Sequence, residues 1–366
     1  MRVHVVDPPA YTPPYDHALC AALARAGADV TLVTTRFAHG SVPDPQGYAV
    51  DRRFYARTPA RLHSRARQAA RLAQHVPDML AYRRRSRAAD IVHFQWLSVQ
   101  QLDRRLLPRD RPLVLTAHDV LPREPTPGQH AAQRALYEQV DAVVVHSQVG
   151  RERLTRDLGI DPARVTVIPH GAFTHLRDVP DPLPLARELA AVGVPVVLLF
   201  GLLRPYKGID VALQAWRGIT GAELWVVGMP RMDTGELRRS APPGVRFVER
   251  FVDDREVAAL FERADIVALP YREADQSGVL ATALAFGTPL VLSDVGGFPE
   301  VAATGAARLV PAGDAAALHA ELTRLLGDAD ARADLAAAAA RAAGEHYSWD
   351  AVAAAHMDLY DGLLAR

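Results

Sequence analysis

Three features are scarce in this sequence, and each shortage excludes something. Its 366 residues contain one cysteine, Cys20, so no internal disulfide can form, which is typical of proteins in a reducing compartment. Asparagine is absent, and of the 42 lysines and arginines only Lys207 is a lysine. No apolar run approaches the ~20 residues that a membrane-spanning helix needs, and Met1 leads directly into a strand-like run without a secretory signal. We therefore expect a cytoplasmic protein.

Charge is balanced, with 42 basic and 42 acidic residues, so the basic excess of a nucleic-acid-binding protein is missing. The balance hides a cationic segment, residues 52–87 from Arg52 to Arg87, with eleven arginines and a single acid, Asp78. Apolar residues recur there at the spacing of a helix face, at Leu62, Ala66, Ala69, Ala73 and Val76. Two interpretations stay open. The helix is solvated and arginine-rich through genome bias, or it contacts an anionic acceptor or, peripherally, the inner face of an anionic membrane.

Strands and helices alternate along the chain. Apolar runs with the length of buried strands form two series, at 3–6, 29–34, 91–96, 113–118, 142–146 and 165–168 and then at 196–200, 222–227, 245–248, 266–269, 289–292 and 307–310. Strands separated by helices form parallel sheets, so we predict an α/β protein with two doubly wound, Rossmann-like domains facing across a cleft. The expected domains are 1–172 and 173–346, with a final helix in 347–366 packing back toward the first.

The sole lysine lies in the most informative stretch, residues 194–210. A strand ends at Gly201, a short loop carries Arg204 and Lys207, and a helix begins at Gly208. A strand, a glycine, a basic loop and a helix start present backbone N–H groups and cations to a phosphate. Where nearly every other cation is an arginine, a retained lysine indicates a place that needs a compact ammonium group.

A second stretch of similar design spans residues 264–299. The run at 266–269 leads into a polar loop with Gln276 and Ser277, and a helix begins at Gly278. The N–H groups and the dipole of a first helical turn attract an anion. Ligands bind at the carboxyl ends of the strands in open α/β sheets, so two anion sites at one edge would suit a diphosphate.

These motifs resemble those of a known family, the retaining nucleotide-sugar glycosyltransferases of family 4. The resemblance is carried by residues 201–208, 264–270, 276–289 and 294–300, with looser matches at 116–119 and 169–171. It implies the GT-B fold, in which two Rossmann-like domains face each other, and an activity. A sugar would pass, with retention and without a metal or other cofactor, from a nucleotide-diphosphate sugar to an acceptor hydroxyl.

The resemblance also implies roles for single residues. Arg204 and Lys207 would bind the donor diphosphate and stabilise the leaving group, and His118 would reach the transferred sugar. The rest of the donor-binding set would be Gly201, Gln276, Ser277, Gly278, Val279, Thr282 and the main chain at Phe251 and Val252.

The chain departs from the family pattern at two places. Many members carry two glutamates eight positions apart, where this chain has Ala274 and Thr282. Asp275 would then take the catalytic role of the first carboxylate. The first loop, often glycine-rich in the family, is full of proline here, and its neighbourhood would shape an acceptor pocket from Tyr11, Tyr15, Asp16 and His17.

Other functions stay open. The chain can be another GT-B enzyme, such as a nucleotide-sugar epimerase, or a protein that binds a nucleotide sugar without turnover. No His, Cys and carboxylate residues show metal-ligand spacing, so we expect no metal. Asp328 and Asp330 match the Asp-x-Asp of metal-dependent transferases, but their place before an alanine-rich helix indicates a helix cap.

Overall fold

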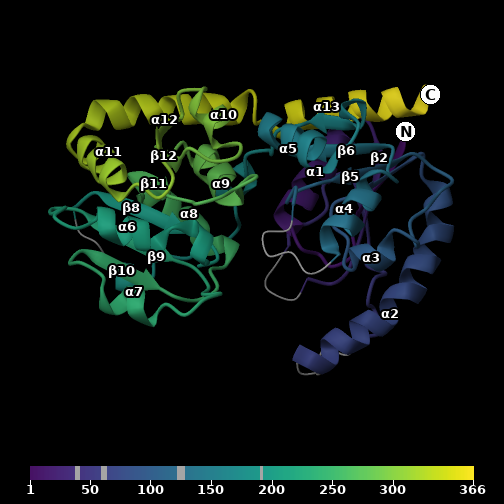
Figure 1. Ribbon diagram of the computed structural model, residues 1–366, viewed down its shortest axis with the longest axis horizontal. Coiled ribbons are helices and arrows are strands. Elements are labelled where there is room, and N and C mark those ends of the chain that lie inside the picture. The colour runs from purple at the N-terminus through teal and green to yellow at the C-terminus, as the bar shows by residue number, and fades with distance from the viewer. Residues whose placement is uncertain (38–41, 59–63, 122–127, 190–192) are drawn as a thin grey trace. The chain divides into compact units, whose positions relative to one another are not determined.

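The chain folds into two compact units, each built around one parallel sheet. The computed structural model describes residues 1–37, 42–58, 64–121, 128–189 and 193–366. One unit consists of Met1–Pro169 with Trp349–Arg366, and the other of His170–Ser348 (Figure 1). The predicted pair of doubly wound, Rossmann-like sheets is confirmed. The last helix belongs to the first unit.

Seven strands form the sheet of the first unit, in the order β3-β2-β1-β4-β5-β6-β7, and every pairing is parallel. Their bounds are β1 (Arg2–Asp7), β2 (Asp29–Thr34), β3 (Ala49–Asp51), β4 (Ile91–Phe94), β5 (Leu113–Thr116), β6 (Ala142–Val145) and β7 (Val165–Val167). The central strands are buried throughout, which explains why they appear in the sequence as continuous apolar runs. No apolar run indicated β3, which has three residues at the sheet edge.

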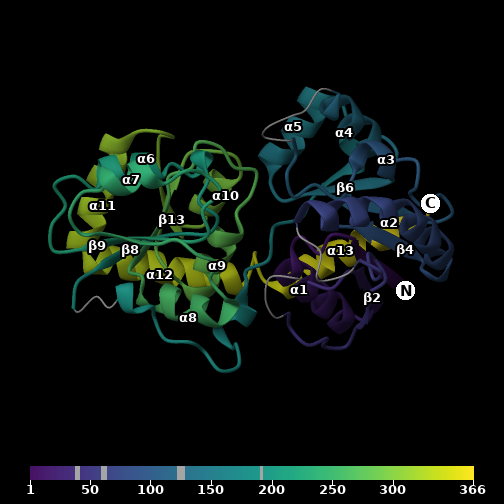
Figure 2. The same cartoon turned by 90° about the horizontal axis from the view of Figure 1, so that it is seen from below.

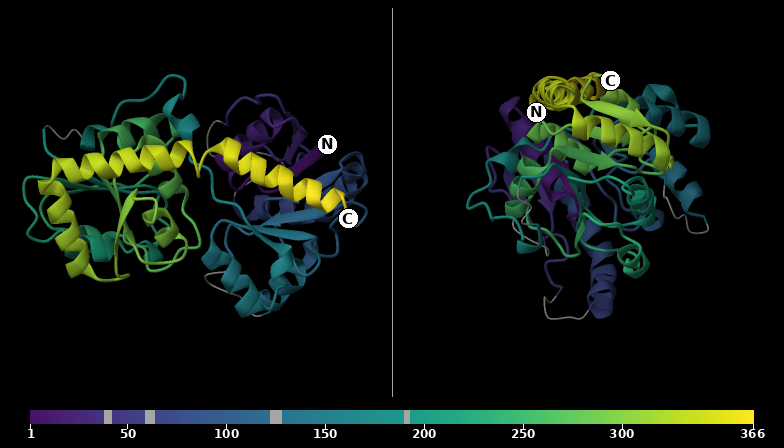
Figure 3. Two further views of the ribbon diagram at one scale, coloured as in Figure 1. Left: turned by 90° about the horizontal axis from the view of Figure 1, so that it is seen from above. Right: turned by 90° about the vertical axis from the view of Figure 1, so that its left-hand side faces the viewer.

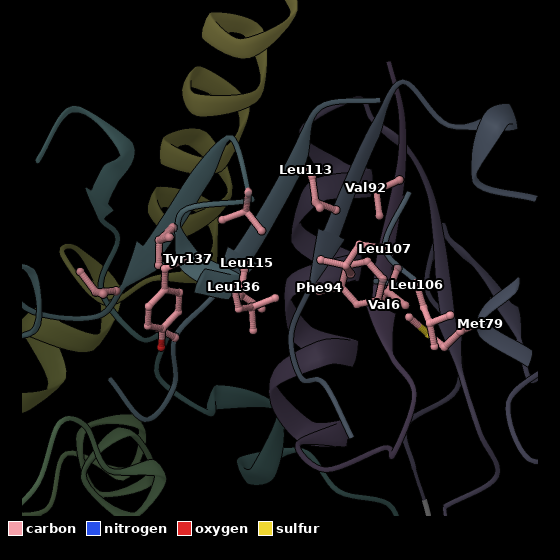
Figure 4. Close-up of a cluster of buried hydrophobic side chains, with 14 of the residues drawn as sticks. Val6, Met79, Val92, Phe94, Leu106, Leu107, Leu113, Leu115, Leu136 and Tyr137 are labelled. Carbon is pink, nitrogen blue, oxygen red and sulfur yellow. The ribbon is translucent and has the colours of Figure 1, made fainter. Parts of the chain in front are cut away.

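Helices cover both faces of this sheet. They are α1 (Pro13–Arg25), α2 (Ser64–Arg85), α3 (Gln100–Asp103), α4 (Gln129–Tyr137), α5 (Gln148–Leu158) and α13 (Trp349–Leu364). On one face, Met79 of α2 and Leu136 of α4 join Phe94 and Leu115 in one core cluster (Figure 4). On the other face, α1 and α13 run side by side (Figures 2 and 3), and Tyr360 of α13 bonds to the His93 ring at 2.6 Å.

Helix α2 packs its larger side chains against the rest of the unit. Its buried side chains are His75, Met79 and Tyr82, whereas Ala69 and Ala73 of the predicted apolar stripe are exposed. Leu62, Arg61 and the rest of 59–63 lie outside the described residues. Large side chains decide which side of a helix packs, because they bury more apolar surface than alanine does. The first turns of α2 project from the body of the unit (Figures 1 and 3).

The second unit repeats the design with six parallel strands, in the order β10-β9-β8-β11-β12-β13. The strands are β8 (Val196–Phe200), β9 (Glu223–Val227), β10 (Val245–Val248), β11 (Ile266–Leu269), β12 (Leu290–Ser293) and β13 (Ala307–Val310). The helices are α6 (Ile209–Ala215), α7 (Gly235–Arg239), α8 (Asp254–Arg263), α9 (Gly278–Phe286), α10 (Phe298–Ala302), α11 (Ala315–Gly327) and α12 (Ala329–Gly344). Trp216 and the apolar side of α11 pack on one face of the sheet.

Short 3-10 turns complete the described chain, at Ser86–Ala88, Pro162–Arg164, Thr174–Arg177, Arg187–Leu189 and Pro205–Lys207. The turn at Arg187–Leu189 lies ahead of β8. Asp328 caps α12 by accepting from the Ala331 N–H, so the cap interpretation of Asp-x-Asp is confirmed. Among the described residues, no helix combines the length and apolarity that crossing a membrane requires.

The strand order reverses once in each unit, between β1 and β4 and between β8 and β11. At such a switch point the loops after the two neighbouring strands leave in opposite directions and open a crevice at the carboxyl edge. In the second unit, the loops that follow β8 and β11 carry Lys207 and Asp275.

A buried histidine makes the stability of the first unit depend on pH. His356 of α13 is fully buried, and burial lowers its pKa from 6.5 to about 4. This histidine therefore takes up its proton at a higher pH in the unfolded chain than in the folded one. The free energy of unfolding falls as the pH drops from 6.5 toward 4. We expect this group to cost about 2 kcal/mol by pH 5.

The variant His356→Leu isolates that effect, because leucine fills much of the same buried space and cannot titrate. Urea unfolding of both proteins at pH 7.5 and pH 5 is the measurement. Titrating groups that lie away from His356 contribute equally to both proteins and cancel in the comparison, whereas His93, whose ring is 5.4 Å from that of His356, is affected together with it. Equal losses of unfolding free energy in the two proteins would contradict the prediction.

Candidate functional site

The loop after β8 brings a cation to the carboxyl edge of the second sheet. Gly201 has a φ of +101°, and its N–H continues the β-ladder to the Val227 carbonyl at 3.0 Å. Lys207 ends the following 3-10 turn, and Gly208, with a φ of +66°, begins the turn into α6. A Cβ atom on Gly208 would lie 2.0 Å from the Pro270 carbonyl oxygen, so only glycine permits this approach of the two loops.

The ammonium group of Lys207 is folded back onto the sheet edge. The side chain is 8% exposed, and Nζ donates to the Phe200 carbonyl at 3.2 Å. A Cβ atom on Gly201 would lie 2.7 Å from that Nζ and 3.1 Å from Cγ2 of Val279. The structure therefore brings together Gly201, Lys207 and Val279, three residues that the sequence assigned to one site.

Val279 belongs to the first turn of α9, the helix within the second predicted stretch. Ser277 caps the helix by accepting from the Leu280 N–H at 3.4 Å. The first N–H groups of a helix have no partner inside it and carry the positive end of the dipole. An ammonium group and a helix start thus converge at the switch point of the sheet, which is an arrangement suited to an anion such as phosphate.

The other predicted residues near this edge differ in exposure and in their hydrogen bonds. Arg204 is partly exposed, and its guanidinium makes no hydrogen bond or ion pair with any described residue. Asp275 is 7% exposed, and the backbone beneath it is fixed because a Cβ atom on Gly296 would lie 1.5 Å from the Ala274 carbonyl oxygen. The Gln276 Oε1 is buried and has no hydrogen-bond partner within the described chain.

Thr282 does not present its hydroxyl to a ligand. It is 4% exposed, and the hydroxyl donates to the Gly278 carbonyl one turn earlier at 2.9 Å. Phe251 and Val252 follow β10 at the same sheet edge, where Phe251 is 44% exposed and Val252 is buried. An aromatic side chain is therefore open to solvent beside the position predicted for the nucleotide base.

In the first unit, His118 lies in a cluster of rings near the ends of β5 and β6. Its Nε2 is 3.1 Å from Oε1 of Gln95, and its ring stacks on Trp96 at 5.0 Å and meets Tyr15 edge-on at 4.8 Å. Its Nδ1 is 3.2 Å from Nε2 of His146.

His146 fixes the direction of that bond. Its Nδ1 donates to the Ile168 carbonyl at 3.0 Å, and burial lowers its pKa to about 4, so it is neutral near pH 7. A neutral ring with the proton on Nδ1 accepts at Nε2. His118 therefore carries a proton on Nδ1.

The residues predicted for the acceptor side differ in exposure and in their neighbours. Tyr15 joins the His118 cluster and is fully buried, whereas Tyr11 is 60% exposed and packs on Trp96 at 4.5 Å. Asp16 and His17 instead line a separate small hollow, together with Ala10, Pro13, Leu32, Thr34, Thr35, Phe37, Val42, Val50 and Arg52.

Asp7 organises the proline-rich first loop. Its carboxylate accepts from the N–H groups of Tyr11 at 2.6 Å and Thr12 at 3.3 Å, and the indole N–H of Trp96 donates to the Thr12 hydroxyl at 2.9 Å. Burial, together with the charge of Asp7, raises the pKa of Asp16 well above its usual range. Two buried carboxyl groups in contact cannot both ionise, so Asp16 holds a proton and Asp7 the charge.

Two family models match the chain. The model "Glycosyltransferase Family 4" covers residues 15–175, and "Glycosyl transferases group 1" covers residues 194–328. The chain is 32% identical over 299 residues to the D-inositol 3-phosphate glycosyltransferase of Xylanimonas cellulosilytica, with 74% of this chain and 71% of that protein covered. It is 33% identical over 240 residues to the phosphatidyl-myo-inositol mannosyltransferase of Mycobacterium leprae, with 62% and 61% covered.

A solved structure shares the whole architecture. Anabaena HepE, crystallised in complex with UDP-glucose, superposes with a TM-score of 0.74 at 17% identity, covering 99% of this chain and 100% of that one. The likeness establishes the fold, and the two family models and the relatives establish the kind of protein. The chain belongs to glycosyltransferase family 4 and is a glycosyltransferase of the GT-B type.

Proposed function

We propose that this glycosyltransferase moves a sugar from a nucleotide-diphosphate sugar to an acceptor hydroxyl with retention of configuration and without a metal ion or other cofactor. The observation that carries the proposal is the convergence of Lys207, Gly201 and the start of α9 at the switch point of the second sheet. UDP-glucose, the ligand in the HepE structure, is the first donor to test.

In this reaction, negative charge grows on the diphosphate as the bond to the anomeric carbon breaks. The Lys207 ammonium and the first N–H groups of α9 stabilise that charge, and the guanidinium of Arg204 adds to them. The acceptor oxygen bonds to the anomeric carbon on the face that the diphosphate leaves. The acceptor proton passes to the departing phosphate oxygen. No separate base is then required, and no metal is needed to neutralise the leaving group.

We place the acceptor at the carboxyl edge of the first sheet, near Tyr11, Asp16 and His17. The exposed ring of Tyr11 is held in place by Trp96 and by the Asp7 contacts of its loop, so it can cover the apolar face of a ring-shaped polyol at low entropic cost. The curated relatives are named for inositol phosphates or phosphatidylinositol, which makes myo-inositol and its monophosphates the first acceptors to test.

The stereochemistry of the product tests the proposal. An α-linked nucleotide sugar should give an α-glycoside, and EDTA should leave the rate unchanged. The anomeric proton coupling of the product, measured by NMR, distinguishes the anomers. A β-glycoside would overturn retention, and loss of activity in EDTA that a divalent metal restores would overturn metal independence. Donor turnover without any acceptor would instead favour an epimerase, and donor binding without turnover would favour a binding protein.

A glycine substitution tests the anion site directly. In Gly201→Ala, the new Cβ atom must displace the Lys207 ammonium, which it would approach to 2.7 Å. We expect nucleoside-diphosphate affinity to fall roughly tenfold, as for the loss of a charge-assisted hydrogen bond of about 1.5 kcal/mol. Isothermal titration with UDP, GDP, ADP and dTDP is the measurement.

The control is Gly218→Ala in the same unit. Gly218 has a φ of +85°, and a Cβ atom there would meet no atom within 4 Å, so this variant carries backbone strain without the contact. Both variants should lose stability, and only Gly201→Ala should lose affinity. Equal affinities in the two variants would remove Gly201 and Lys207 from the donor site.

We also propose that α2 contacts an anionic membrane surface. Leu72 is 56% exposed and Leu80 is 42% exposed, and Arg84 and Arg85 are exposed in the last turn of the same helix. Asp78, the only acid of the segment, is engaged by the Tyr55 N–H at 2.7 Å. Exposed leucines beside arginines suit the boundary between lipid headgroups and acyl chains.

Vesicle binding tests this contact. The protein should co-sediment with phosphatidylglycerol vesicles at low salt and be released at high salt. The double variant Arg84→Gln/Arg85→Gln should bind about 30-fold more weakly, since each arginine contributes about 1 kcal/mol at such a surface. The control double variant Arg217→Gln/Arg239→Gln removes two exposed arginines from the second unit. No binding at low salt, or an equal loss in the control, would refute the contact.

A further inference from the structure

An aromatic ring lies beside the ammonium group of Lys207. Nζ is 5.1 Å from the centroid of the Tyr271 ring, while it donates to the Phe200 carbonyl at 3.2 Å. The face of an aromatic ring attracts a cation within about 6 Å, and the attraction grows when water is excluded. The ring face and the carbonyl thus contact the same ammonium group.

Packing fixes the Tyr271 ring. It is 3% exposed, meets the Tyr206 ring edge-on at 5.6 Å and lies 5.5 Å from the ring of Phe298. Tyr271 follows β11 by two residues, and Lys207 follows β8, the neighbouring strand across the switch point. The ring is thus a rigid feature of the same sheet edge as the ammonium.

Arg272 fastens the two loops to each other. Its N–H donates to the Tyr206 carbonyl at 2.7 Å, and its guanidinium donates to the Pro205 carbonyl at 3.0 Å and to the Asp210 carboxylate at 2.6 Å. These bonds bracket Lys207 on both sides along the chain. The separation of the two loops is therefore set by these bonds.

We propose that Tyr271 is a positioning residue whose ring face holds the Lys207 ammonium beside Gly201 and the start of α9. This inference rests on the proposed function, in which Lys207 stabilises the leaving diphosphate. A flexible side chain would otherwise lose conformational entropy each time the donor binds.

The single lysine permits a direct test that needs no activity. Protein labelled with 13C,15N-lysine gives one side-chain spin system, because Lys207 is the only lysine. Protons above an aromatic face resonate upfield, so the Lys207 ε-protons should be shifted upfield in the wild-type protein and in Tyr271→Phe. They should move to the position of free lysine in Tyr271→Leu. The control Tyr347→Leu, which removes another buried ring of the second unit, should leave them unchanged.

Binding of UDP, GDP, ADP and dTDP provides the functional measurement. Tyr271→Leu should weaken nucleoside-diphosphate binding about fivefold, the fold-change that about 1 kcal/mol produces, and Tyr271→Phe should stay within about twofold of wild type. Lys207→Ala is the reference variant. If it binds the diphosphate as tightly as wild type, the proposed role of Lys207 fails.

The two failures are distinguishable. If Lys207→Ala loses affinity while Tyr271→Leu keeps both the affinity and the shifted lysine signal, the positioning role of Tyr271 is overturned and the donor site stands. If Tyr271→Leu does not fold, the position of the Lys207 ε-protons in the wild-type and Tyr271→Phe spectra tests the inference. An unshifted Lys207 signal in the wild-type protein overturns the inference without any variant.

Discussion

The candidate donor site depends on the close approach of backbone segments at the carboxyl edge of the second sheet. A Cβ atom on Gly208 would lie 2.0 Å from the Pro270 carbonyl oxygen, and one on Gly228 would lie 1.8 Å from that of Gly201. The loops after β8, β9 and β11 therefore meet main chain to main chain. Their contact sets where Lys207 lies relative to α9. The position of the positive charge is thus a property of the sheet edge more than of a side-chain rotamer.

The two units use the same edge in different ways. In the second unit, the edge presents cations and helix N–H groups, which suits an anion. In the first unit, the corresponding edge holds His118, whose ring nitrogens lie close to His146 and Gln95, and the carboxyl pair of Asp7 and Asp16. The cations and helix N–H groups of the second unit therefore suit the diphosphate of a donor, and the polar groups of the first unit suit the hydroxyl groups of an acceptor.

The sequence predicted most of the fold because buried parallel strands are continuous apolar runs, as at 196–200 and 266–269. It missed β3, whose three residues at the sheet edge carry no such pattern. It did not indicate which side of α2 packs on the sheet, because alanine tolerates either side of a helix, and the larger His75, Met79 and Tyr82 decide the packing side.

The candidate site was predictable in part for a similar reason. Gly201 and Lys207 lie in one strand–loop–helix segment, so their spacing along the chain indicated their chemistry, and the α9 start had the same signal. No sequence signal indicated Tyr271, since a tyrosine after a strand is common. Its contact with Lys207 arises only when β8 and β11 become neighbours. Short sequence motifs therefore identify functional residues that lie in one loop. They do not identify residues such as Tyr271, which reach the site only through tertiary contacts.

The geometry also explains the composition. In a chain with 42 basic residues, one lysine remains, and its Nζ lies in the narrow space between Gly201, Val279, the Phe200 carbonyl and the Tyr271 ring. An ammonium group is compact and can direct its donors to the carbonyl and to a ligand at once. A guanidinium is planar and larger, so it would not reproduce these contacts unchanged. The bias that made the other cations arginine therefore meets a steric limit at this position.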